Sequence, residues 1–134
     1  MLIPNREVNP RQCLSSIAFT MAIEKGFTVD DSFRTEMRDR IENVLSSRHD
    51  HMIDQTESAG ANITLGYALW GLGGSHTSPS KLTALAVNYL LVLQNREGSW
   101  SGGNARPPIE YYSFTGTALA IYTIQQYATP GLKD

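Results

Sequence analysis

The sequence predicts an all-α fold, built from αα-hairpin repeats that form an arc of about five helices. Apolar residues recur every three or four positions, the spacing that places them on one face of a helix. Short segments rich in Gly and Pro separate these stretches, as helix ends require. Small residues also recur at intervals of 50, at Ser16, Gly66 and Gly116, each followed two positions later by alanine. A period of this size is typical of stacked helix hairpins.

The first two helices are expected before residue 49. The first runs from Pro10, a residue type favoured at helix starts, to Gly26. Its apolar positions follow the rhythm of one buried face: Leu14, Ile17, Ala18, Met21 and Ala22. Thr28 is expected as the N-cap of the second helix, which is charged on one face like an outer, solvent-facing helix. The other face carries an apolar stripe of Phe33, Met37, Ile41, Val44 and Leu45.

A polar segment at residues 49–60 is expected to be a loop between the second and third helices. The third helix is predicted at 61–72 and ends at the glycine pair 73–74. It contains few charges and is apolar on most sides, so it is predicted to be an inner helix.

The fourth helix is predicted to open with Ser78 as its cap and Pro79 as its first residue. A loop rich in Gly and Pro follows at 95–112, and a fifth helix covers 114–127. Inner and outer helices therefore alternate, and the chain contains two full hairpins and one lone inner helix.

The composition indicates a single domain spanning residues 1–134, with an ordinary apolar fraction of 41% and a charged fraction of 18%. The net charge is −2 without a clustered basic excess, so no nucleic-acid partner is expected. Cys13 is the only cysteine, which excludes an intramolecular disulfide and favours a reducing compartment. The N-terminus lacks the apolar stretch of a signal peptide, and apolar runs are too short to cross a bilayer. We expect a soluble, cytoplasmic protein.

The turn that follows the fourth helix contains Gln94, Gly98 and Trp100 in the pattern Gln-x3-Gly-x-Trp. A Gln near a helix end can bond exposed backbone groups, Gly permits a positive φ, and Trp can stack across the junction. In this helical context the stretch resembles the QW motif of squalene and oxidosqualene cyclases, found in the prenyltransferase and squalene oxidase repeat superfamily. Segments 106–111 and 114–120 also look like bacterial members of that superfamily. The resemblance implies an α/α toroid, or a segment of one, in which inner helices line a central cavity.

The catalytic groups of the resembling families are missing here. Squalene-hopene cyclase-like enzymes protonate their substrate with Asp-x-Asp-Asp, whereas Asp30 and Asp31 follow Thr28, which is not acidic. Protein prenyltransferases use an Asp, Cys and His zinc site, but Cys13 has no matching pattern, nor does it form a haem-attachment sequence. The polar run of His49, Asp50 and His51 with Asp54 is favoured as a solvated loop over a metal site. No catalytic residue, metal or cofactor is therefore predicted.

Two groups of residues are candidates for ligand binding. Aromatic residues expected on inner helices can line an apolar cavity, although a plain core role is favoured; they are Tyr67, Trp70 and Tyr122. The loop before the last helix contains Arg106, Glu110 and Tyr111, which can fix the polar end of a ligand. For Arg106 and Glu110, an ion pair that locks the loop is the favoured alternative.

The leading functional hypothesis is a non-catalytic repeat module that binds an apolar ligand, such as an isoprenoid, or a protein partner. The last inner helix should leave an apolar edge, so a homo-oligomer or docking to another repeat subunit is expected. The alternative is a terpene-cyclase-like enzyme, active as an oligomer or with an acid supplied by a partner chain. A third interpretation is a structural domain whose cavity is filled by side chains. Fold resemblance by itself does not establish any of these functions.

Overall fold

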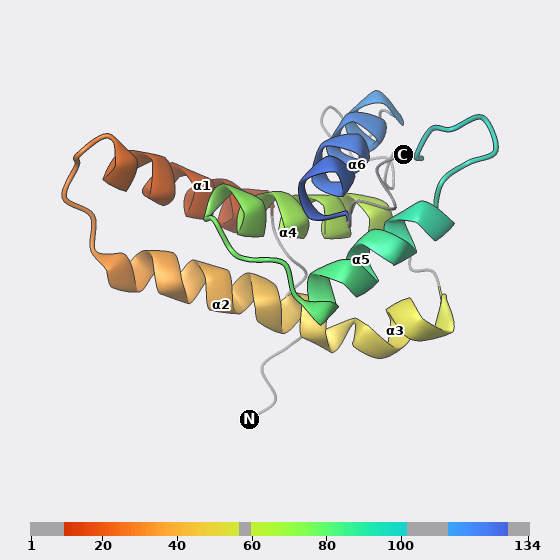
Figure 1. Ribbon diagram of the computed structural model, residues 1–134, viewed down its shortest axis with the longest axis horizontal. Helices are drawn as coiled ribbons and strands as arrows, with labels where there is room; N and C mark the ends of the chain where they lie inside the picture. The colour runs from red at the N-terminus through yellow and green to blue at the C-terminus, as the bar shows by residue number, and fades with distance from the viewer. Residues whose placement is uncertain (1–9, 57–59, 102–112, 129–134) are drawn as a thin grey trace.

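The chain folds into helices alone over the residues that the computed structural model describes, 10–56, 60–101 and 113–128 (Figure 1). No strand occurs in these ranges, so the predicted all-α class is confirmed. None of the described helices is both long and apolar enough to span a membrane. The six helices are α1 (Pro10–Glu24), α2 (Asp31–Ser47), α3 (His49–Asp54), α4 (Ala61–Gly74), α5 (Lys81–Val92) and α6 (Ser113–Tyr127).

Helix α4 is the centre of the described structure, because it contacts α1, α2, α5 and α6. Helices α1 and α6 both pack on α4 but make no contact with each other, so the three form a row. Helices α2 and α5 lie along this row and touch one another, and α3 packs against both (Figure 1). The core lies between the row and these covering helices, where Ile41, Leu45, Leu65, Leu72 and Leu90 are almost completely buried.

Glycines let α4 approach its two neighbours in the row closely. A Cβ at Gly71 would lie 3.1 Å from the Cα and Cβ of Cys13 on α1. On the other side, a Cβ at Gly66 would lie 2.7 Å from the Cγ of Leu119 on α6. Ile17, one turn after Cys13, lies similarly close to Gly74, so α1 and α4 run in the same direction. Gly66, one of the predicted repeat positions, therefore serves helix–helix contact.

The segment predicted as a loop at 49–60 contains the short helix α3, so this prediction was wrong. Its polar residues, including His49 and His51, are exposed, while Met52 is 3% exposed and joins the core. Because Met52 alone is buried in this short polar helix, the segment has no periodic apolar pattern that would predict a helix.

Two predicted caps were also wrong. Asp30 rather than Thr28 caps α2, and its carboxylate accepts a hydrogen bond of 2.9 Å from the N–H of Ser32. Ser80 rather than Ser78 caps α5, and it exchanges hydrogen bonds with Thr83 in a capping box. Several residues near the start of each helix have side chains that can act as an N-cap. The residue that caps the helix is the one whose side chain forms a hydrogen bond with a backbone N–H of the first turn.

The sequence predicted the wrong buried face for the first helix. Leu14 and Met21 are 46% and 54% exposed, and Ala18 is exposed too. The buried residues of α1 are instead small ones: Cys13, Ser16 and Thr20. Because α1 meets α4 at the glycine positions, the face that packs there is the one with small side chains. The larger apolar residues point elsewhere.

We expect Gly71→Ala to destabilise the protein by about 1–3 kcal/mol, because the added methyl group overpacks the contact with Cys13 and Ile41. Gly73→Ala is the matched control in the same helix. The Cβ added there meets only the amide end of the exposed side chain of Gln126, which can move away. This control should be neutral or stabilising by up to about 1 kcal/mol, from helix propensity. Urea unfolding measures both, and equal effects would contradict the close α1–α4 contact.

The buried thiol of Cys13 predicts a loss of stability at high pH. Burial raises the pKa of Cys13 to about 12, so the thiol ionises in the unfolded chain before it ionises in the folded one. Stability is therefore complete below the unfolded pKa and decreases as pH rises from that value towards 12, by at most about 1.4 kcal/mol per pH unit. Burial and Glu42 raise the pKa of Tyr127 to about 12, which adds an effect of the same sign.

Urea unfolding of wild type and Cys13→Ala at pH 8 and pH 10.5 measures this contribution. The variant should lose less unfolding free energy between the two pH values than wild type does. Tyr127→Phe should independently reduce the loss of unfolding free energy between the two pH values. Equal pH dependence of wild type and Cys13→Ala would show that the Cys13 thiol is accessible to hydroxide in the folded state.

Candidate functional site

Two side-chain clusters stand out among the described residues, and both involve residues that the sequence selected. One is the turn after α5, residues 94–101, which we call the Trp100 turn. The other is the group of Tyr67 and Trp70 on α4 with Tyr122 on α6, which we call the aromatic cluster. The third set of candidates, Arg106, Glu110 and Tyr111, lies outside the residues that the structure describes.

The Trp100 turn is closed by local hydrogen bonds. The side-chain amide of Gln94 donates to the carbonyl of Gly98 at 2.9 Å, and the N–H of Asn95 donates to the carbonyl of Ser99 at 2.8 Å. Gly98 has φ of 89°, in the left-handed region where a side chain is strained. Gln94 and Gly98 therefore fix the shape of the turn, as their residue types predict.

Trp100 connects this turn to the helices around it. Its indole is 3% exposed and donates from Nε1 to the carbonyl of Leu90, near the end of α5, at 2.7 Å. Its backbone N–H donates to Oγ1 of Thr117 on α6 at 3.0 Å. The next carbonyl, that of Ser101, accepts from Nδ2 of Asn62 on α4 at 2.7 Å. The turn thus joins α5, α6 and α4.

The predicted aromatic stacking of Trp100 is not among the ring contacts of the described residues, which involve other rings. Burial and the N–H bond to Leu90 hold the indole instead. Every polar group at Trp100 that the structure describes is engaged within the protein. Trp100 accordingly has a structural role, in which it connects the turn to α5 and α6.

The aromatic cluster is a surface feature. The ring centroids of Tyr67 and Trp70 lie 6.1 Å apart, and those of Trp70 and Tyr122 lie 6.5 Å apart in an edge-on arrangement. Tyr122 is 52% exposed, and Tyr67 and Trp70 are half-buried. At 3.6 residues per turn, Tyr67 and Trp70 lie on the side of α4 opposite the buried Leu65 and Leu72.

Tyr67 packs against the core, as the favoured interpretation expects, whereas Tyr122 is more than half exposed. The sequence places Trp70 and Tyr122 on different helices, 52 positions apart, and only the packing of α6 on α4 brings them together. The result is a partly open aromatic surface between two helices of the row. Such a surface can contact an apolar chain or a flat apolar ring system.

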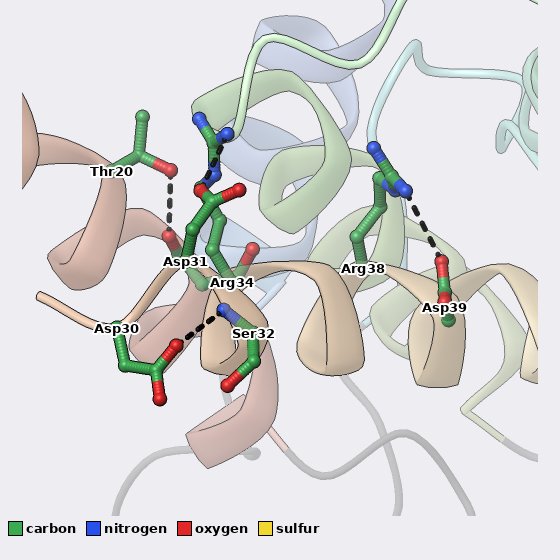
Figure 2. A network of polar contacts seen from close by, with 8 residues as sticks. Thr20, Asp30, Asp31, Ser32, Arg34, Arg38 and Asp39 are labelled. Carbon is green, nitrogen blue, oxygen red and sulfur yellow. Dashed lines mark hydrogen bonds and ion pairs between the residues drawn. The ribbon is translucent and has the colours of Figure 1, made fainter.

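The two acidic residues at the start of α2 act in helix capping (Figure 2). Asp30 accepts the N–H of Ser32, and this bond holds the pKa of its carboxyl below the usual value. Asp31 forms an ion pair with Arg34 at 2.7 Å. A carboxyl with a lowered pKa is ionised at neutral pH and is a poor general acid.

The other candidate chemical groups are engaged or buried. Nδ1 of His49 lies 3.0 Å from Asp50, and Nδ1 of His51 lies 2.8 Å from the hydroxyl of Thr56. Among the described residues no three His, Cys, Asp or Glu side chains are grouped to hold a metal ion. The raised pKa of Cys13 keeps its thiol protonated, which disfavours nucleophilic attack or metal binding.

One polar contact has no signal in the sequence. His76, in the turn between α4 and α5, pairs with Glu24 at the end of α1. His76 has φ of 56°, a left-handed conformation that directs this turn. The two residues are 52 positions apart, and both side chains are more than half exposed, so the pair contributes little to stability.

Comparison of this chain with protein-family models, with curated proteins and with solved structures finds no match.

We expect Trp100→Phe to destabilise the protein by about 1–3 kcal/mol, because the carbonyl of Leu90 loses its indole donor and part of a buried ring is removed. Trp70→Phe is the matched control, since Trp70 is half-buried and no hydrogen bond of its indole is described. It should cost less than about 1 kcal/mol. Thermal unfolding followed by circular dichroism measures both. A larger loss for Trp70→Phe would contradict the fastening role of Trp100.

Proposed function

We propose that this protein is a non-catalytic helical repeat module that binds an apolar ligand, of isoprenoid type, against the aromatic cluster. The observation that carries the proposal is the placement of three aromatic rings from α4 and α6 on one partly open surface. A folded protein exposes single apolar side chains freely, but grouped exposed aromatics mark contact sites.

The energetics favour a ligand with a long apolar part. Each exposed ring removes apolar area from water when a chain covers it, at about 25 cal/mol per Å². Tyr122 offers more than half of its surface for this purpose, and Tyr67 and Trp70 offer smaller parts. The phenol groups of Tyr67 and Tyr122 lie at the polar ends of their rings, where a ligand hydroxyl can form hydrogen bonds. A prenyl alcohol fits this combination.

We infer no catalytic role because the side chains that could act as acid or nucleophile are bonded to other groups or buried. Asp30 and Asp31 are used in capping and ion pairing, and Cys13 is buried and protonated. The aromatic cluster itself consists of two phenols and an indole, without a carboxylate or an imidazole. Binding without turnover is the function that these residue types support.

Titration with farnesol, a linear prenyl alcohol, tests the proposal. We expect saturable binding that quenches the fluorescence of the partly exposed Trp70, while the buried Trp100 responds little. Tyr122→Ala should weaken binding about tenfold, which corresponds to about 1.4 kcal/mol of lost ring contact. It should leave stability almost unchanged, because Tyr122 is half exposed.

Ile53→Ala is the matched control, since Ile53 is 56% exposed on α3, away from the cluster. This variant should bind farnesol like wild type. Binding that is equally strong in wild type and in Tyr122→Ala would remove the aromatic cluster as the site. No saturable binding in wild type would overturn the proposal itself.

A further inference from the structure

Helix α1 buries little apolar surface for its length. Its buried residues, Cys13, Ser16 and Thr20, are small, and two of them are polar. Its larger apolar side chains are partly buried, such as Ile17, or about half exposed, such as Met21. Hydrophobic stabilisation grows with the apolar area that is removed from water, so the packing of α1 contributes less than that of a helix that buries large side chains.

A buried hydroxyl further weakens the attachment of α1. Oγ of Ser16 is buried, and it has no hydrogen-bond partner in the part of the chain that the structure describes. A hydroxyl that leaves water without a new partner destabilises the packed state. Thr20 is satisfied within α1, because its Oγ1 donates to the carbonyl of Ser16 at 3.0 Å. That bond persists whether or not α1 lies against α4.

Helix α6, at the other end of the row, is held more firmly. The hydroxyl of Tyr127 donates to the carbonyl of Thr77 at 2.9 Å, and Thr117 accepts the backbone N–H of Trp100. Tyr127 and Leu119 are also buried, at 5% and 9% exposure. By contrast, the pair of Glu24 on α1 with His76 is exposed and contributes little to stability. The two ends of the row therefore differ in how strongly they are attached.

The connection between α1 and α2 allows α1 to move separately. Residues 25–30 form this exposed segment, at the end of the molecule far from α6 (Figure 1). Gly26 has φ of 84°, and a Cβ there would have no atom within 4 Å, so nothing packs against the turn at this point. Among the described helices α1 contacts α2 and α4 alone, whereas α2 also packs on α3, α4 and α5. Helix α1 can leave while α2 remains in place.

We propose that α1 is a hinged cover, which opens from α4 and α2 about residues 25–30 while the other helices stay folded. Opening uncovers Cys13, the single thiol of the chain, and the face of α4 that contains Gly71 and Gly74. Local opening of this kind occurs where few apolar contacts are buried, at a lower free energy than global unfolding. The proposal does not rest on ligand binding at the aromatic cluster.

Reaction of the native protein with N-ethylmaleimide, followed by mass spectrometry, tests the proposal. Labelling of Cys13 should be slow, because the thiol is fully buried while α1 is closed. Its rate should rise with urea at less than about half the slope of global unfolding, since opening exposes one helix only. Val87→Cys in a Cys13→Ala background is the control, because Val87 is 1% exposed on α5. Its labelling should require global unfolding and show the full slope.

Substitutions away from α1 and within it separate the two kinds of opening. Trp100→Phe should speed labelling of the Val87→Cys thiol more than about fivefold, because it lowers global stability, and leave labelling of Cys13 unchanged. Ser16→Ala should slow labelling of Cys13 about tenfold, because the closed state no longer buries an unpaired hydroxyl. Ala18→Ser, at an exposed site on the same helix, is the matched control and should change the rate about twofold at most.

Three outcomes would overturn the proposal. Equal acceleration of both thiols by Trp100→Phe would show that Cys13 becomes accessible only through global unfolding. Labelling of native Cys13 as fast as in the urea-unfolded chain would show that α1 does not cover the thiol. An unchanged rate in Ser16→Ala would show that the buried hydroxyl does not favour opening. Circular dichroism verifies that each variant is folded before labelling.

Discussion

The close approach of α4 to α1 and α6 is the contact on which the described structure depends. Gly71 and Gly66 have no Cβ; a methyl group at Gly66 would collide with Leu119, and one at Gly71 would press on Cys13 and Ile41. This closeness aligns α1 and α4 in one direction and selects small residues for the packed face of α1. As a consequence, the larger side chains Leu14 and Met21 remain in contact with solvent.

The Trp100 turn adds hydrogen bonds that hold α6 in this row. Its bonds to Leu90, Thr117 and Asn62 hold the end of α5 against α6 and α4. The direct packing of α6 on α4 brings Tyr122 to Trp70, and the bonds of the turn add to the contacts that hold α6 there.

Two different apolar surfaces follow from this arrangement. The aromatic cluster lies between α4 and α6 and combines ring faces with two phenol groups. The exposed apolar residues of α1 and α6, such as Leu14 and Phe114, carry no polar side-chain groups and lie along single helices.

The sequence by itself determined five of the six described helices and their approximate bounds, because periodicity, Pro10 and the left-handed Gly98 are local properties. It also identified the residues of the Trp100 turn and the aromatic types of the cluster. Tertiary structure alone decided which apolar faces are covered: Leu65 is buried and Leu14 is exposed, although both follow helical spacing. The physical reason is that periodicity records the chemistry of a face, whereas burial depends on whether a neighbouring helix lies against it.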